Sequence, residues 1–170
     1  CAEQGSTEEQ IEESQRAMAQ MRAILGHPDR LKKLAADMVE HYEALCAEKP
    51  EIVQKAMIVC ADRAVAFRLL QEILAIRPEW GQKHRAEDES VLTEEQLDKL
   101  MPLPKINLVA TQGANDEKDL FEACGTKEYR KMLDRQFKNN DSNFKIAVVV
   151  DMWITGFDVP SLAVMYIDKP

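Results

Sequence analysis

The chain has 170 residues, of which 45% are hydrophobic and 31% charged, with a formal net charge of -8. This composition is that of a folded water-soluble protein, and the length suits one domain with an appended arm. No apolar run approaches the roughly 18 residues of a membrane-spanning helix, and the first 20 residues are acidic, so neither a membrane partner nor a secretory signal is expected. The acidic balance also argues against a free-standing nucleic-acid binder, so any DNA contact should be local.

Residues 1–50 predict a helical arm made of two helices. Ser6-Thr7-Glu8-Glu9 offers a capping box for the first helix, and Gly26 ends it. Pro28 suits the first turn of the second helix. An apolar stripe along this second helix must cover either the chain's own sheet or a neighbouring domain. Its members are Leu31, Leu34, Ala35, Met38, Val39, Tyr42 and Leu45.

From residue 51 the pattern changes to short apolar runs separated by amphipathic segments. The runs 55–60, 105–110, 144–150 and 162–167 predict buried strands, and a helix is expected over 62–76. Strands that alternate with helices indicate an α/β domain with a mostly parallel sheet covered on both faces. The polar stretch 80–90 is expected to be an exposed, weakly ordered insertion, and Thr93 with Gln96 predicts a short capped helix after it.

The cysteines and histidines do not predict a metal site or a disulfide framework. Cys1, Cys46, Cys60 and Cys124 are far apart in the sequence and form no C-x-x-C motif. The three histidines lack ligand spacing to any cysteine or carboxylate. We therefore expect reduced thiols and a cytoplasmic protein.

In an open parallel sheet, ligands bind beyond the carboxyl ends of the strands. The most informative segment there is 151–160, in which a buried strand runs into Asp-x-x-x-Thr-Gly-x-Asp-x-Pro. Gly156 permits close approach of the backbone to a ligand, Thr155 offers a hydroxyl, and Asp158 can accept hydrogen bonds from a ribose. The alternative is a turn in which these side chains bond their own backbone.

A basic stretch over 127–145 interrupts the acidic composition. As a helix over about 126–139 it would bury Tyr129, Met132, Leu133 and Phe137. Its charges are either a solvated face or a patch that faces nucleic acid or an adjoining domain. They are Lys127, Arg130, Lys131, Arg135, Lys138 and Lys145.

Residues 145–170, KIAVVVDMWITGFDVPSLAVMYIDKP, resemble motif V and the following strand of superfamily-two helicases and translocases. The sequence pattern VVDMW-TGFD-PSL is similar to that of the motor (R) subunit of type I restriction endonucleases. HPDRLKKLAADMVEHYEAL resembles the helical lead-in to the second motor domain, and KAMIVCADRAVAFRLLQEI resembles motif IV. The likeness runs from about Pro28 to Pro170 and is weak over 80–104.

The resemblance implies a three-layer RecA-like domain over 51–170, the second of two that clamp ATP and track duplex DNA. Gly156 and Asp158 match the motif V pair that reaches the nucleotide. Asp151 and Thr155 match the part of that motif that couples nucleotide state to the DNA path.

Four further residues are implied in DNA binding or coupling. Arg63 with Ala64 falls where motif IV contacts the DNA backbone, although Asp62 stands where the family has a hydroxyl residue. Thr111 and Gln112 follow the next motif strand and share the DNA-binding or coupling role.

The family's other parts are not found in these 170 residues. There is no G-x-x-x-x-G-K-[ST] and no D-E-A-H-like box, so ligands for the ATP phosphates and Mg2+ are expected elsewhere. The only segment with nuclease-like residues is Asp116-Glu117-Lys118, and it is interpreted as a solvated helix start. The chain is expected to be inactive alone, and to be a fragment cut before motif VI.

The implied partners are duplex DNA, the first RecA-like domain, and the specificity and methyltransferase subunits of a restriction complex. The competing hypothesis is a non-catalytic interaction module that keeps the RecA-like fold.

Overall fold

The computed structural model describes residues 2–150, 159 and 161–168. Its centre is a four-stranded sheet in the order β2-β3-β1-β4, in which every neighbouring pair is parallel. All residues of β1, β2 and β3 are buried, as continuous apolar runs in a covered parallel sheet should be. The expected α/β class is confirmed. The strands are β1 (Lys55–Cys60), β2 (Ile106–Val109), β3 (Ile146–Val149) and β4 (Leu162–Asp168).

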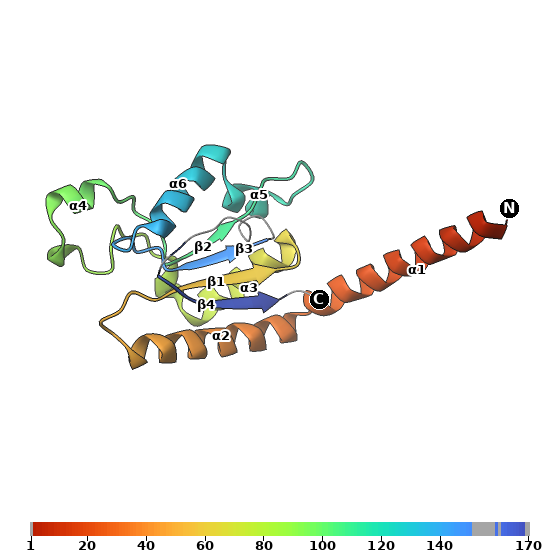
Figure 1. The fold of residues 1–170 in the computed structure, drawn as a ribbon, viewed down its shortest axis with the longest axis horizontal. Coiled ribbons are helices and arrows are strands. Elements are labelled where there is room, and N and C mark those ends of the chain that lie inside the picture. Colours follow the sequence, from red (N-terminus) through yellow and green to blue (C-terminus); the bar gives the residue numbers. More distant parts are fainter. Residues whose placement is uncertain (1, 151–158, 160, 169–170) are drawn as a thin grey trace.

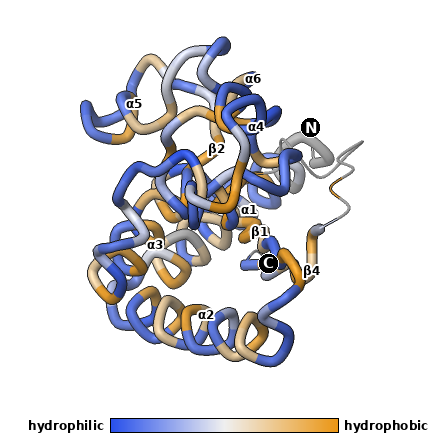
Figure 2. The backbone as a smooth tube through the Cα atoms, turned by 90° about the vertical axis from the view of Figure 1, so that its left-hand side faces the viewer, coloured by the Kyte–Doolittle hydropathy of each residue, from blue (hydrophilic) through white to orange (hydrophobic). Residues whose placement is uncertain are grey.

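Helices cover both faces of this sheet and give a three-layer domain (Figure 1). On one face, α2 (Pro28–Glu48) and α3 (Arg63–Ile76) pack on Ala56 and Ile58. On the other face, α6 (Lys127–Lys138) packs on Met57 and Val59, which alternate with Ala56 and Ile58 along β1. Successive side chains of a strand point to opposite faces, so β1 contributes to both cores. In Figure 2 the strands are largely orange between bluer helices.

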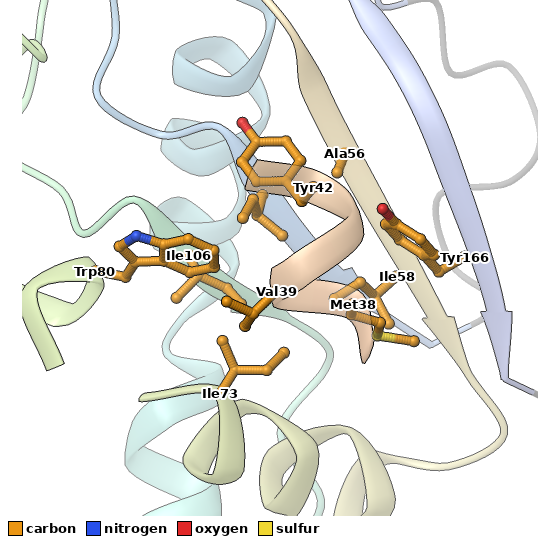
Figure 3. A pocket seen from close by; sticks show the side chains of 10 residues that line it. Met38, Val39, Tyr42, Ala56, Ile58, Ile73, Trp80, Ile106 and Tyr166 are labelled. Carbon is orange, nitrogen blue, oxygen red and sulfur yellow. The ribbon is translucent and has the colours of Figure 1, made fainter. Parts of the chain in front are cut away.

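The apolar stripe of α2 covers the chain's own sheet. Leu31, Ala35, Met38, Val39 and Tyr42 are all buried in this core. Figure 3 shows Met38, Val39 and Tyr42 facing strand residues across a cavity of about 10 Å³. A space of that size holds one water at most, so it is part of the core and not a ligand site.

Helix α1 (Ala2–Leu25) extends away from the sheet (Figure 1). It begins before Ser6, so the prediction of a capping box there is wrong. Ala2, Glu3 and Gln4 are good helix formers, and the helix runs from them through Gly5 and past the candidate cap. The end at Gly26 is confirmed, and His27 caps α2 by accepting from the Asp29 backbone N–H at 3.2 Å.

The segment between α3 and β2 corrects a second expectation. Residues 77–104 hold two short 3-10 helices, Pro78–Gly81 and Glu89–Val91, and α4 (Glu94–Asp98). The stretch 80–90 was expected to be exposed and weakly ordered, but Trp80 and Ala86 are buried. Trp80 packs edge-to-face on Tyr42 with ring centroids 6.0 Å apart, and His84 pairs with Leu103. The apolar surface of these side chains outweighs the polar residues between them. The capping box of Thr93 and Gln96 is confirmed.

Two buried lysines stabilise the edge of the sheet where the strands begin, which we call the amino-terminal edge. Lys55 donates to the carbonyls of Phe137 and Asn139 at the end of α6. Lys145 donates to the carbonyls of Asn140 and Ser142, at 3.0 and 2.5 Å. These lysines supply the donors that the last carbonyls of a helix and its following loop require.

Candidate functional site

The carboxyl ends of β1, β2 and β3 open onto one hollow of about 260 Å³. Residues that follow three different strands line it, which is the arrangement expected of a ligand-binding edge in a parallel sheet. Two of the predicted DNA contacts, Arg63 and Thr111, are thereby brought together. The lining residues are Ala61, Asp62, Arg63, Ala110, Thr111 and Val150.

Asp62 and Arg63 start the helix that follows β1. The Asp62 carboxylate accepts from the Val65 backbone N–H at 2.8 Å and so caps α3. This bond gives Asp62 a structural role at the position where the resemblance implies a hydroxyl residue. Arg63 is left to face the hollow, with its side chain 32% exposed.

Arg63 links the loop after β1 to the loop after β2. Its Nη1 donates to the Thr111 carbonyl at 3.0 Å and forms an ion pair with the Asp116 carboxylate. Asp116 also accepts from the Gly113 backbone N–H at 2.6 Å. The two loops therefore form one hydrogen-bonded unit at the edge of the hollow.

The helix start predicted at Asp116-Glu117-Lys118 is confirmed, because a helix begins at Lys118 with exposed Glu117 at its N-cap position, but the prediction that Asp116 is solvated is wrong. Its side chain is only 7% exposed. Burial raises the pKa of this carboxyl, but the hydrogen bonds from Gly113 and Arg63 outweigh burial, so the pKa lies below its ordinary value. Sequence reasoning missed Asp116 as a site residue. Its partner Arg63 lies 53 positions earlier, so no local sequence pattern identified it.

Gln112 and Ala64 lie beside this unit. The Gln112 side-chain amide donates to the Phe121 carbonyl at 2.9 Å, which ties the loop to α5 (Lys118–Cys124). Ala64 is exposed and lines a second hollow of about 290 Å³ between α3 and the start of α5, together with Asp116. The ion pair of Arg63 with Asp116 thus stands between two open hollows.

The predicted nucleotide and coupling residues lie outside the described part of the chain. They are Asp151, Thr155, Gly156 and Asp158. Val150, the residue immediately before them, lines the hollow with Arg63 and Thr111.

The basic residues of the stretch 127–145 differ in exposure. Arg130 is partly buried and donates to the Gly125 carbonyl at 3.0 Å. Lys127, Lys131, Arg135 and Lys138 are exposed on α6, and Leu133 and Phe137 are buried as predicted. Lys145 is buried and belongs to the amino-terminal edge. Tyr129 and Met132 are only partly buried.

At the end of β4, Asp168 has a structural partner. Its two carboxylate oxygens accept from Arg30 Nη1 and Nη2 at 2.8 and 2.9 Å. The Arg30 Nε also donates to the Leu25 carbonyl at 3.0 Å. This bidentate pair fixes the start of α2 against the end of the edge strand.

Within the described residues, no group of three or more His, Cys, Asp or Glu side chains is placed to hold a metal ion. In the same part of the chain, none of the helices has the length and apolar character needed to cross a membrane.

A four-stranded parallel sheet between two helical layers, with a hollow at the carboxyl edge, is consistent with a three-layer RecA-like α/β domain. A family model for domain 3 of type I restriction enzyme subunit R matches residues 37–170. The chain belongs to this family.

Three curated relatives agree with this assignment. The chain is 34% identical over 148 residues to the type I restriction enzyme HindI endonuclease subunit of Haemophilus influenzae. This aligned region covers 86% of the chain and 12% of the relative. It is 31% identical over 165 residues to a putative type I restriction enzyme MjaIXP endonuclease subunit of Methanocaldococcus jannaschii. This aligned region covers 96% of the chain and 13% of the relative. A putative MjaVIIP subunit of the same organism is 29% identical over 154 residues, 88% of the chain and 13% of its own length.

The chain thus spans 12–13% of the length of these curated relatives. The activity, substrates and partners of a whole subunit are therefore matters for proposal.

Proposed function

We propose that the chain is the second motor domain of an ATP-dependent DNA translocase, within the R subunit of a type I restriction endonuclease. The observation that carries the proposal is the unit formed by Arg63, Thr111 and Asp116 at the carboxyl edge of the sheet. It joins two loops that resemble DNA-contacting motifs and presents a guanidinium beside an open hollow. Arginine is well suited to bind phosphate because its planar donors match phosphate oxygens.

In this proposal the DNA backbone lies along the carboxyl edge, over Arg63, Ala64, Thr111 and Gln112. The acidic chain as a whole repels DNA, so the contact depends on local groups. An arginine and loop backbone N–H groups satisfy that requirement without a basic surface. Asp151 and Thr155 are assigned to coupling between the nucleotide and this DNA path.

ATP and Mg2+ belong to the complete motor in this proposal. Gly156 and Asp158, which lie outside the described residues, would approach the nucleotide from the side of this domain. The described residues contain neither a phosphate-binding loop nor a cluster of metal ligands. The phosphate and magnesium ligands are therefore assigned to the first RecA-like domain.

The partners proposed for the complete subunit are duplex DNA and the specificity and methyltransferase subunits. Sequence recognition is assigned to the specificity subunit, since phosphate contacts position a protein on DNA but carry no base information.

Replacing Arg63 by alanine in the full-length subunit should weaken binding to duplex DNA. The loss should be the same for all sequences, because a phosphate contact is independent of the bases. The slope of log Kd against log salt should fall by about one unit, since one fewer counterion is released. Fluorescence anisotropy over a salt series measures both quantities.

The matched control is Lys49→Ala, which removes the same charge from an exposed position at the end of α2, beside the amino-terminal edge of the sheet. It should leave the salt slope within error. If Arg63→Ala also leaves the slope unchanged while the protein stays folded, the DNA path does not cross this edge.

A further inference from the structure

The Asp116 carboxylate occupies donors that suit an anionic ligand. One is the Gly113 backbone N–H, at 2.6 Å, and the other is the Arg63 guanidinium. A loop N–H combined with a guanidinium is a common donor set for a phosphate oxygen, because both form strong hydrogen bonds to an anion. Asp116 thus sits where the phosphate of a bound nucleic acid would find its donors.

The ion pair is asymmetric in its exposure to solvent. The Asp116 side chain is 7% exposed, whereas the Arg63 side chain is 32% exposed and lines the hollow at the carboxyl ends of the strands. The guanidinium is therefore the member that a ligand in the hollow can reach. Asp116 is held from behind by Gly113.

Gly113 makes this close packing possible. A Cβ atom at position 113 would lie 2.5 Å from Arg63 Nη2 and 2.9 Å from an oxygen of Asp116. The guanidinium and the carboxylate therefore lie directly against the backbone of the loop after β2. A side chain there would push Arg63 out of its place.

We propose that Arg63 and the Gly113 N–H form a position for a phosphate of the DNA backbone, and that Asp116 is an internal competitor which DNA displaces. The inference rests on the proposed function, since it names the regulation of the same DNA-binding edge. Each phosphate contact then forms by exchange of one anion for another. The net gain per contact is small, which suits a surface that has to release DNA repeatedly.

Removing the competing charge should strengthen DNA binding. In the full-length subunit, Asp116→Asn retains an acceptor for the Gly113 N–H and loses the charge that holds Arg63. We expect a duplex without a recognition site to bind about two- to fivefold more tightly, which corresponds to the usual strength of a partly exposed ion pair. The gain should vanish when Arg63 is absent. The Arg63→Ala/Asp116→Asn double variant should therefore bind the duplex no more tightly than Arg63→Ala alone.

The control is Asp98→Asn, which removes one negative charge from an exposed position on α4, away from both hollows. It should change the affinity far less than Asp116→Asn, and melting temperatures would show that every variant is folded. Weaker or unchanged binding by folded Asp116→Asn would overturn the competitor role, and so would an equal gain in the Asp98→Asn control. Those results leave the proposed function standing if Arg63→Ala still lowers the salt slope. If Arg63→Ala changes neither the DNA affinity nor the salt slope, with Asp116 or with Asn at position 116, both the competitor role and the proposed function fail.

Discussion

Replacing Lys55 by methionine should remove the contribution of Lys55 to the rise in stability between pH 7 and pH 9. Lys55 is fully buried on β1, with its ammonium 5.2 Å from the centre of the Phe137 ring. Burial and the charge of Lys145 lower the pKa of Lys55 to about 7, although Asp141 acts in the opposite sense. Methionine fills a similar volume without a titratable group.

The sign follows from proton binding in the two states. The folded-state pKa lies below the unfolded value of about 10.4, so the unfolded state binds more protons between these two values. The free energy of unfolding therefore rises with pH across this window. From pH 7 to pH 9 the wild-type chain should gain about 2 kcal/mol relative to Lys55→Met. The neutral amine keeps its N–H donors, so the bonds to the α6 carbonyls survive deprotonation.

Urea unfolding of both proteins at pH 7 and pH 9 measures this difference, because titrating groups common to the two proteins cancel. Lys83→Met, at an exposed position, is the matched control and should follow the wild-type curve. Parallel curves for wild type and Lys55→Met would show that Lys55 does not titrate in this range.

Alanine at position 125 should destabilise the domain strongly. Gly125 follows α5 with φ at 67° and ψ at -175°, a conformation that is essentially confined to glycine. A Cβ there would also lie only 2.9 Å from Tyr129 Cγ. Backbone strain and this overlap together should cost about 2–4 kcal/mol, or about 10 °C in melting temperature.

Gly81→Ala provides the comparison in a thermal melt. Its Cβ would meet only Leu74, at 3.3 Å, and its φ is not in the left-handed region. The melting temperature should change little. A similar shift for both variants would contradict the special role of the backbone at Gly125.

The strands and most helix ends could be predicted because each depends on local sequence. The run from Lys55 to Cys60 is apolar without interruption, which is typical of a strand covered on both faces. The end of α1 at Gly26 and the box of Thr93 with Gln96 have local causes and are confirmed. The start of α1 was placed wrongly because a capping pattern can also occur inside a longer helix.

The burial of Trp80 could not be predicted, because it depends on a contact with Tyr42, which is 38 positions earlier in the sequence. Polar neighbours dominate the local composition there. Lys145 was grouped with surface charges for the same reason, since only the tertiary fold brings loop carbonyls to its ammonium.

The candidate site was predicted in place but not in detail. Parallel topology alone brings the ends of β1 and β2 to one edge, so Arg63 and Thr111 could be expected together. The ion pair of Arg63 with Asp116 spans 53 positions, and no sequence pattern specifies it. Its discovery changes Arg63 from a free cation into one that already has an anionic partner.

Photo-crosslinking in the full-length subunit tests the central claim most directly. A photoreactive phenylalanine derivative at Ala64, on the carboxyl edge, should crosslink to duplex DNA. The same group at Ile52, which is exposed beside the amino-terminal edge, should not. Crosslinking from Ile52 with none from Ala64, or equal yields from both, would contradict the assignment of the carboxyl edge as the DNA-tracking surface.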